Sequence, residues 1–426
     1  GGSTGWIDDY QSEVEVTNNI ATLGQYSFSS SFVLRNETII LGFNSSDIED
    51  SEDQLTLTAK YRSPSGDWSD SYLSTMWYNA DYGHWETNFT PLPTAELGYY
   101  DIRIMIEDTD GDSSDWSTFE DSIHVISNPP IITDYEITES DILRTEYSII
   151  SVGVYDVEDA AQNMSVLIQY RSISGNWSTE ELSEIFYNSD SNRWETTFTP
   201  NTTAELGLYD IRVKVIDLDD GESSWSVYED NITVGNNLPQ FHDYLLTYDH
   251  DYDVLDKQNV TLLRTNAILI FVNSTDIEDE PAIHEIIIES RSPTGVWTSQ
   301  YISWWGSNQS KSPDYHGAYY FTPDKEAELG LYDMRIMVND TDRGSSNWST
   351  FSSVFNVTNN KPEFAAYYET GLSVLRNESL VLGFSAVDIE EELEELTVIV
   401  EYRQPQGNWS GTYLSDLTYN SETETW

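Results

Sequence analysis

The chain has 426 residues, of which 38% are hydrophobic and 13% aromatic, and its 75 acidic and 19 basic side chains give a net charge of −56. This composition can build packed cores and excludes an intrinsically disordered chain. The scarcity of Lys and Arg argues against nucleic-acid partners and against binding to or insertion into an anionic membrane. Because Cys is absent, disulfides, thiolate metal sites and Cys nucleophiles are excluded.

One pattern recurs four times along the chain. Each copy opens with a Leu-Arg pair, continues 12 residues after the Arg with an acidic segment, and then has a Trp. The Leu residues are Leu34, Leu143, Leu263 and Leu375; the acidic segments begin at Asp47, Asp156, Asp276 and Asp388; the Trp residues are Trp68, Trp177, Trp297 and Trp409. Successive copies are 109, 120 and 112 residues apart, which fits a small β-sandwich and exceeds a solenoid repeat.

The repeat predicts the domain organisation. Residues 1–19 are expected to be the last strand of a preceding repeat, because GSTGWIDDYQSEVEVTNN parallels GSSNWSTFSSVFNVTNN at 344–360. Complete repeats are expected at 20–128, 129–237 and 238–360, and the first half of a fourth at 361–426. Asn and Pro near residues 127, 235 and 358 predict short extended linkers. We interpret the chain as part of a longer tandem array.

The elements expected within each repeat are strands only. In the second strand of the first repeat, Leu41, Phe43 and Ser45 alternate with Ile40, Gly42 and Asn44, and in the second repeat the matching face carries Ile150, Val152 and Val154. Within the stretch at 203–226, one face carries Tyr209, Ile211, Val213 and Val215, and the other carries Asp210, Arg212 and Lys214. This alternation is typical of a sheet with one buried face.

The third repeat departs most from the others. It has an insert near 248–259, and Gly317 stands where the other repeats have Trp85 and Trp194. It is therefore the repeat in which we expect a specialised contact.

The stretch AELGLYDIRVKV at 204–215 resembles the start of strand F in immunoglobulin-like and fibronectin type III domains. In those domains a Tyr at the E–F corner hydrogen-bonds back to the backbone, and Tyr100, Tyr209 and Tyr332 match its position. The chain thus resembles the tandem immunoglobulin-like (fibronectin type III or cadherin-like) repeats of archaeal or bacterial surface-layer and adhesin proteins. The resemblance implies an all-β tandem array of immunoglobulin-like antiparallel β-sandwich domains.

The same resemblance implies that acidic loops meet at the junctions between repeats. In such a sandwich the B–C and F–G loops share one pole, while the A–B turn and the E–F corner share the other. One junction would gather Glu37, Glu96, Asn128, Asp156, Glu158, Asp159, Asp217 and Asp219. The next would gather Glu146, Glu205, Asn236, Asn237, Asp276, Glu278, Asp279, Asp340 and Asp342, and the pole of the first repeat carries Asp47, Glu49, Asp50, Asp108 and Asp110.

Crowded carboxylates of this kind favour a bound cation. Two like charges about 4 Å apart repel by roughly 4 kcal/mol at an effective dielectric near 20, and Ca²⁺ takes six to eight oxygen ligands. Cadherin-like junctions are comparable, so Ca²⁺ is the expected cofactor. Two departures are the Asn and Pro of the linkers and Asn266, which replaces Glu in the third repeat. The alternative is that these loops are ordinary polar turns.

Sequons for N-glycosylation are frequent and predict N-linked glycans on an extracellular chain. The 15 acceptors are Asn36, Asn44, Asn88, Asn163, Asn176, Asn201, Asn231, Asn259, Asn273, Asn308, Asn339, Asn347, Asn356, Asn377 and Asn408. The alternative is a surface that is simply rich in Asn, Ser and Thr.

The remaining marked residues predict no catalytic site. The repeated tryptophans, with Trp116, Trp225 and Trp348, are expected to pack within the sandwiches rather than to stack on sugars. Of the adjacent pair Trp304 and Trp305, one is expected to face outward. The six His lack the spacing of a zinc site, and identical acidic loops in every repeat do not build one glycosidase cleft.

These patterns favour a structural extracellular glycoprotein over an enzyme. The leading hypothesis is a cell-surface array (a surface layer, sheath or filament) that associates with identical chains and is stiffened by Ca²⁺. One alternative is an adhesin stalk whose binding domain lies outside this chain, and another is an accessory region of a secreted hydrolase. Adaptation to high salt is a further explanation of the acidity.

Overall fold

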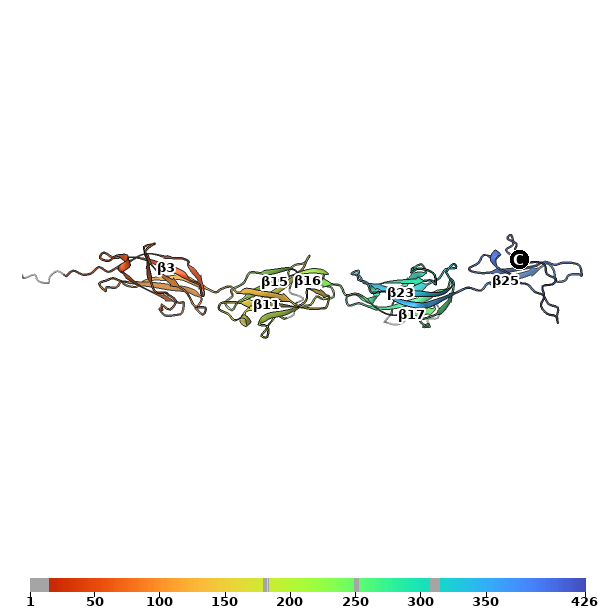
Figure 1. Cartoon of the computed structure of the whole chain (residues 1–426), viewed down its shortest axis with the longest axis horizontal. Coiled ribbons are helices and arrows are strands. Elements are labelled where there is room, and N and C mark those ends of the chain that lie inside the picture. Colours follow the sequence, from red (N-terminus) through yellow and green to blue (C-terminus); the bar gives the residue numbers. More distant parts are fainter. Residues whose placement is uncertain (1–14, 179–181, 183, 249–252, 307–314) are drawn as a thin grey trace, which may run out of the picture. The chain divides into compact units, whose positions relative to one another are not determined.

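The computed structural model of the chain describes residues 15–178, 182, 184–248, 253–306 and 315–426. Two compact units, Gly1–Gly235 and Asn236–Trp426, make up the chain. The first unit holds two β-sandwiches, called sandwich 1 and sandwich 2 here (Figure 1). The second unit holds sandwich 3 and a two-stranded sheet.

Each sandwich consists of two four-stranded sheets. In sandwich 1 the sheets have the strand orders β1-β3-β6-β5 and β2-β8-β7-β4. The short β2 pairs in parallel with β8, while the other pairs are antiparallel. The strands are β1 (Thr22–Phe28), β2 (Phe32–Leu34), β3 (Ile39–Ser46), β4 (Thr56–Arg62), β5 (Trp77–Asn79), β6 (His84–Phe89), β7 (Gly98–Glu107) and β8 (Ser117–Ile126).

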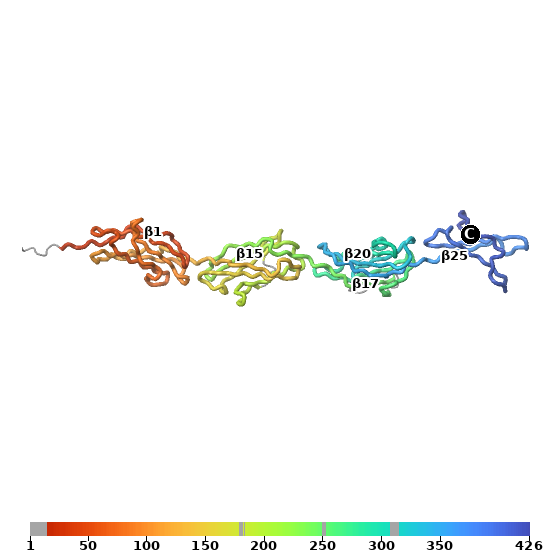
Figure 2. The backbone as a smooth tube through the Cα atoms, in the orientation of Figure 1, coloured from red at the N-terminus to blue at the C-terminus, as the bar shows by residue number. Residues whose placement is uncertain are grey.

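Sandwich 2 repeats this order with sheets β13-β14-β11-β9 and β10-β16-β15-β12, and the backbone runs back and forth along it in the same way (Figure 2). Its strands are β9 (Ile131–Ile137), β10 (Asp141–Leu143), β11 (Ser148–Tyr155), β12 (Ser165–Ser172), β13 (Phe186–Asn188), β14 (Arg193–Phe198), β15 (Gly207–Ile216) and β16 (Ser226–Gly235).

Sandwich 3, in the second unit, has sheets β17-β19-β22-β21 and β18-β24-β23-β20. Its strands are β17 (Gln240–Tyr248), β18 (Val260–Leu263), β19 (Ile268–Thr275), β20 (Glu285–Arg291), β21 (Ile302–Gly306), β22 (His316–Phe321), β23 (Gly330–Asn339) and β24 (Ser349–Thr358). The two-stranded sheet that follows pairs β25 (Glu363–Glu369) with β26 (Leu382–Val387). The strand order of the three sandwiches confirms the predicted all-β, tandem immunoglobulin-like fold.

The helical elements of the described residues are single 3₁₀ turns: η1 (Glu52–Gln54), η2 (Ala161–Asn163), η3 (Pro281–Ile283) and η4 (Leu393–Glu395). No helix in this described part of the chain is long and apolar enough to cross a membrane.

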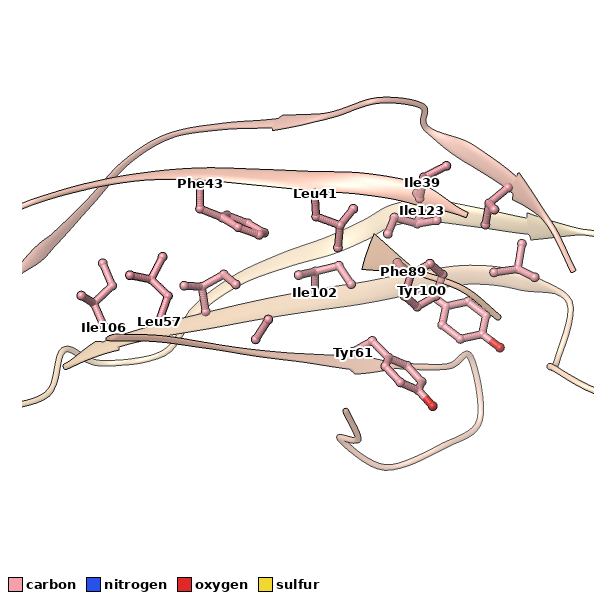
Figure 3. Close-up of a cluster of buried hydrophobic side chains, with 14 of the residues drawn as sticks. Ile39, Leu41, Phe43, Leu57, Tyr61, Phe89, Tyr100, Ile102, Ile106 and Ile123 are labelled. Atoms are coloured by element: carbon pink, nitrogen blue, oxygen red, sulfur yellow. The ribbon is translucent and has the colours of Figure 1, made fainter. Parts of the chain in front are cut away.

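The core of each sandwich lies between its two sheets, where the alternation read from the sequence places the apolar side chains. In sandwich 1, Leu41 and Phe43 of β3 face Ile102 of β7 across the core, and all three are completely buried (Figure 3). The outward Ile40 of the same strand is exposed. The predicted one-sided burial of these strands is therefore confirmed.

The predicted tyrosine corner is present in all three sandwiches. The hydroxyls of Tyr100, Tyr209 and Tyr332 donate to the carbonyl four residues upstream, at 2.8, 2.9 and 2.8 Å. These acceptors belong to the Glu of each AELG segment. Burial raises the pKa of Tyr100 and Tyr332 well above the ordinary range, so the phenols stay protonated donors. Each corner fixes the start of strand β7, β15 or β23 against the preceding turn.

Sandwich 3 carries a second apolar cluster on the opposite face of β19. Leu269, Phe271 and Ala318 are buried there and are covered by side chains that include Trp305. The neighbouring Trp304 is 65% exposed, so one of the two adjacent tryptophans faces outward, as predicted. The described part of the insert also folds back: the carbonyl of Lys257 accepts a hydrogen bond from the Tyr244 hydroxyl at 3.0 Å.

Candidate functional site

The acidic segment after β11 forms a tight turn around Asp156. Its Oδ1 accepts the backbone N–H groups of Glu158 and Asp159, at 2.7 and 2.9 Å. The same two-bond pattern recurs around Asp47, Asp276 and Asp388. An Asp that bonds the backbone two and three residues ahead is a common polar turn, so this part of the site is explained by local chemistry.

The F–G loop of each sandwich is organised by a second Asp, which is buried in sandwiches 1 and 2 and half-buried in sandwich 3. In sandwich 2, Oδ1 of Asp217 accepts the N–H groups of Asp219 and Gly221, both at 2.8 Å. Asp159 then links the two loops, because its Oδ2 accepts the N–H of Leu218 at 3.2 Å. In sandwich 1 the matching link runs from Thr109 to Asp50, and Asp108 takes the place of Asp217. In sandwich 3 it runs from Thr341 to Asp279, and Asp340 takes that place. The predicted convergence of the two loops at one pole is thus present in each sandwich.

An Asn of the preceding linker closes each pole. Asn128 donates both its backbone N–H and its side-chain amide to Oε1 of Glu158, at 3.0 and 2.7 Å. Asn237 and Asn360 bind Glu278 and Glu390 through the same two bonds, and the side chain of Asn19 binds Glu49. We call this contact the linker clamp. The residue before the clamp Asn adds a bond to the F–G loop, from Asn18 to Asp108, Ser127 to Asp217 and Asn236 to Asp340.

The poles of sandwiches 2 and 3 each keep two carboxylate oxygens that the linker clamp leaves unpaired. Oδ2 of Asp156 and Oε2 of Glu158 are buried and have no hydrogen-bond partner among the described residues, and the same holds for Asp276 and Glu278. Burial, followed by the neighbouring Asp156, raises the pKa of Glu158, and Glu278 is raised for the same reasons. Asp217 also has a raised pKa, mainly from burial. A proton or a cation between these oxygens would relieve their repulsion.

In the first unit an Arg joins sandwich 1 to the pole of sandwich 2. Arg35 donates its Nε hydrogen to the carbonyl of Ala95 at 2.7 Å, and its Nη1 lies 2.7 Å from Oδ2 of Asp219. The carbonyl of Arg35 accepts the side-chain amide of the clamp residue Asn128 at 2.7 Å. In the second unit Arg264 repeats two of these bonds, to the carbonyl of Ala327 and from Asn360. The Leu-Arg pair therefore belongs to the junction, a role that sequence reasoning did not give it.

The structure gives the Glu residues predicted at the opposite pole other partners. Glu96 accepts the N–H and hydroxyl of Ser65, and Glu205 accepts the hydroxyls of two nearby serines. These bonds lower the pKa of both carboxyls. Glu146 accepts the N–H of Leu143 in its own turn. Glu37, Asp110 and Asp342 are exposed. Glu96, Glu205 and Glu146 thus each bond residues of their own sandwich.

No group of three or more His, Cys, Asp or Glu among the described residues is placed so that it could hold a metal ion as it stands. The poles of sandwiches 2 and 3 do each assemble a pair of unpaired oxygens, one from an Asp and one from a Glu. Oxygen donors of this kind are the ones that Ca²⁺ prefers. A cation here would need water or backbone oxygens to complete its shell.

The repeated tryptophans lie outside the buried cores, contrary to the packing predicted for them. In sandwich 1 the guanidinium of Arg103 lies between the rings of Trp68 and Trp116, 4.3 and 4.2 Å from their centroids, and Arg62 lies 5.0 Å from Trp68. Sandwiches 2 and 3 repeat the stack with Arg212 and Arg335. In each stack the Arg belongs to a strand and holds two Trp rings that lie outside the strands, by contacts between the cation and the ring faces.

The sequon asparagines within the described residues are all exposed or half-buried. Asn308 lies outside the described residues. Among those with a specific bond, Asn231 accepts the Tyr135 hydroxyl at 2.6 Å through Oδ1. The side-chain nitrogens of Asn44 and Asn339 donate to the carbonyl of Gly83 and to Glu285.

No model of a known protein family matches the chain, and no curated protein sequence matches it. Among solved structures, the titin domains z1z2 in complex with telethonin share 14% identity over 52% of this chain and 100% of that one, with a TM-score of 0.28. The Escherichia coli adhesin FdeC shares 11% identity over 79% of this chain and 96% of that one, with a TM-score of 0.24. The structure of Dpr2 Ig1-Ig2 in complex with DIP-Theta Ig1-Ig3 shares 11% identity over 80% of this chain and 100% of that one, with a TM-score of 0.25. Scores this low carry no functional argument, and the immunoglobulin-like fold stands on the strand order above.

Proposed function

We propose that this chain is a non-catalytic segment of an extracellular, tandem-repeat glycoprotein that builds a surface layer, sheath or filament together with identical chains. The observation that carries the proposal is the linker clamp, which recurs at Asn19, Asn128, Asn237 and Asn360. A linker that is hydrogen-bonded to the domain after it at every repeat suits a structural chain, because these bonds limit the motion of neighbouring domains. The chemistry of the poles repeats as well, which suits structure better than a single catalytic cleft.

We further propose that Ca²⁺ binds at each pole, between the unpaired oxygens of Asp156 and Glu158 in sandwich 2 and of Asp276 and Glu278 in sandwich 3. Their burial without a partner among the described residues, and the raised pKa of Glu158 and Glu278, support a site that favours added positive charge. Bound Ca²⁺ would neutralise the pair and so strengthen the hold of the linker clamp on its Glu. Extracellular Ca²⁺ modules bind at about 10⁻⁴ to 10⁻³ M.

The proposal of N-linked glycans rests on the exposed or half-buried sequons. The proposal of self-association requires that cations neutralise the negative charge of neighbouring chains. With a net charge of −56, neighbouring chains repel unless cations neutralise them, and Ca²⁺ would do this at the poles. Mass spectrometry of the protein from its own cells tests the glycans: occupied sequons support an extracellular glycoprotein, and bare asparagines throughout contradict it.

Hydrogen exchange of the full chain, followed by mass spectrometry at fixed ionic strength, tests the Ca²⁺ site. We expect millimolar CaCl₂, but not MgCl₂, to slow exchange in β11–β12 and in β19–β20. The double variant Asp156→Asn with Glu158→Gln is expected to lose the effect in β11–β12 and to keep it in β19–β20. Glu205→Gln is the matched control, because it removes a carboxylate that bonds Ser172 and Ser174 of the same sandwich and is not one of the unpaired pair.

The linker clamp has its own test, which is independent of Ca²⁺. Asn128→Ala removes the side-chain bonds to Glu158 and Arg35, and small-angle X-ray scattering of the full chain would report the spread of interatomic distances. We expect a broader distribution for Asn128→Ala than for Asn176→Ala, which changes an exposed Asn outside the linkers. Identical distributions would contradict a positioning role for the linker.

A further inference from the structure

The first strand of every sandwich stands at the edge of its sheet. These strands are β1, β9 and β17, and each is the last in its strand order, next to β3, β11 or β19. An edge strand presents a row of backbone N–H and C=O groups that its own sheet does not use, and such a row pairs readily with the edge of another chain. The three edges differ in how this row is protected.

Charged side chains protect the edge of sandwich 2. Strand β9 carries Asp134 and Glu136, and both carboxylates form ion pairs with Arg193 of β14, at 2.9 and 2.6 Å. The two acidic side chains lie on the same face of the sheet, because they are two residues apart in a strand. A second copy that offered its own β9 would therefore bring like charges together, which is a common defence of an edge.

The insert protects the edge of sandwich 3. Within its described part, Val254 forms a β-bridge with Thr247 of β17, and Leu255 donates its N–H to the carbonyl of Leu246 at 2.9 Å. Thr247 also pairs with Leu269 of β19. Thr247 thus has a neighbouring strand or segment on each side, and this part of β17 is no longer a free edge.

Strand β1 of sandwich 1 has neither kind of protection among the described residues. No charged side chain and no sequon occurs from residue 16 to residue 34, whereas the equivalent stretch of the second repeat, 125–143, has four acidic side chains. Gln25 and Ser27 stand in the places of the two acidic residues of β9. Both are exposed, so a chain that approaches this edge meets uncharged side chains.

A tyrosine that β1, β9 and β17 share shows how far each edge is covered. Tyr135 of β9 is half-buried and donates its hydroxyl to Asn231 at 2.6 Å. Tyr244 of β17 is 2% exposed and donates to the carbonyl of Lys257 in the insert at 3.0 Å. Tyr26, at the same place in β1, is 52% exposed. Sandwich 1 therefore leaves an aromatic ring at its edge that a second chain can cover.

We propose that the edge of β1 pairs with β1 of a second copy of this chain, in an antiparallel arrangement about a two-fold axis. The inference rests on the proposed self-association and names the surface through which identical chains meet. Two chains of net charge −56 repel each other, and an uncharged edge is a place where they can approach. Two-fold symmetry makes one edge the partner of its own copy.

The hydrogen bonds between β1 and β3 set the register of the proposed pair. Ser29 donates its N–H to the carbonyl of Ile40 at 2.9 Å, so its N–H points toward β3. Because this direction alternates along a strand, the N–H of Ser27 also points toward β3, and those of Tyr26 and Phe28 point outward. The outward groups exchange hydrogen bonds when Tyr26 of one copy lies opposite Phe28 of the other. The two Ser27 residues then face each other at the axis, with Cα atoms about 4.5 Å apart.

The absence of Cys allows a direct test, because a single introduced Cys is the only thiol of the chain. We expect Ser27→Cys to form a disulfide-linked dimer of the full chain under mild oxidation, since the proposed pair brings the two Cα atoms within the span of a disulfide. Thr75→Cys, at an exposed residue before the opposite edge strand β5, is the matched control and should stay monomeric over the same time. Non-reducing electrophoresis measures both.

A second test copies the charges of sandwich 2 onto β1. Gln25→Asp with Ser27→Glu changes two exposed positions, and sedimentation equilibrium of the full chain at fixed ionic strength should show dimerisation at least about tenfold weaker. Thr75→Asp with Thr118→Glu adds the same charge at exposed positions outside β1 and should dimerise like the unchanged chain. Each chain is measured with and without millimolar CaCl₂.

The outcomes separate this inference from the proposed function. If Gln25→Asp with Ser27→Glu still dimerises like its control, or Ser27→Cys links no faster than Thr75→Cys, the β1 edge is not the interface, and self-association through another surface still stands. If the unchanged chain stays monomeric with and without CaCl₂, both the interface and the proposed self-association are wrong. Loss of dimers in the charged variant, together with rapid linking of Ser27→Cys, is the result that we expect.

Discussion

Sandwich 2 and sandwich 3 share a strand order, a tyrosine corner, an Arg–Trp stack and an acidic pole, yet differ in the packing beside the turns η2 and η3. Trp194 ties β14 to the turn η2, whereas Gly317 leaves β22 beside a hollow with the buried His284. The shared features are the ones that a repeat needs in order to fold. The exchange of Trp194 for Gly317 and of Met164 for His284 breaks a local rule of core packing, and such departures commonly mark functional positions.

The largest effect is expected from removing the indole of sandwich 2. Trp194→Ala loses the packing of the ring and its bond to Ala161, and we expect a loss of about 3 kcal/mol in the unfolding free energy of sandwich 2. Hydrogen exchange in β14 and β12 measures it. Trp225→Ala, which removes a ring of the surface stack, serves as control and should cost far less. Equal costs would mean that the indole is not structural.

The tyrosine corners should behave alike in the two sandwiches. Tyr209→Phe and Tyr332→Phe each remove a bond to a backbone carbonyl and leave the ring in place. We expect each to cost about 1.5 kcal/mol, because a buried carbonyl loses its donor. Urea unfolding, read by exchange in β15 and β23, checks this. A clear inequality would show that the two folds are less equivalent than their strand order indicates.

His284 should make sandwich 3 sensitive to pH where sandwich 2 is not. Because burial lowers its folded pKa below the ordinary 6.5, its contribution to stability is present above that pH and is lost as the pH falls through the folded pKa. His284→Leu should remove this dependence and stabilise sandwich 3 at pH 7 by about 1 kcal/mol. Exchange in β20, corrected for intrinsic rates, measures both, with Met164→Leu in sandwich 2 as control. Unchanged pH dependence in His284→Leu would exclude this residue as its source.

Substitutions in the acidic poles should have the smallest effect on stability. The stability contribution of these Glu residues should depend on pH in the opposite direction to that of His284. The folded pKa of Glu158 and Glu278 is raised above the ordinary 4.5, so their contribution is fully present below that value and is lost as the pH rises through the folded pKa. Without Ca²⁺, Glu158→Gln and Glu278→Gln should each raise stability at pH 7 by at most about 1 kcal/mol. Thermal unfolding in EDTA measures it. A loss of stability would show that the ionised Glu is needed by its linker clamp.

Local sequence patterns determined most of the fold. Alternation in stretches such as residues 209–215 places one face in the core, since successive side chains of a strand point to opposite sides. The Tyr of the corner bonds a carbonyl only four residues away, so its role follows from a short motif. The pairing of acidic loops at one pole likewise followed from the strand order that the resemblance implied.

Contacts between distant residues were decided by the tertiary structure alone. Arg35 meets Asp219, and Asn128 meets Glu158, because folding brings an edge strand, a linker and two loops to one pole. The Trp residues read as core belong to surface stacks, because alternation places the intervening Arg on the outer sheet face. The hollow of sandwich 3 needs Gly317 and His284 from opposite sheets. A sequence shows each as a lone departure, and only the packing of the two sheets brings them to one hollow.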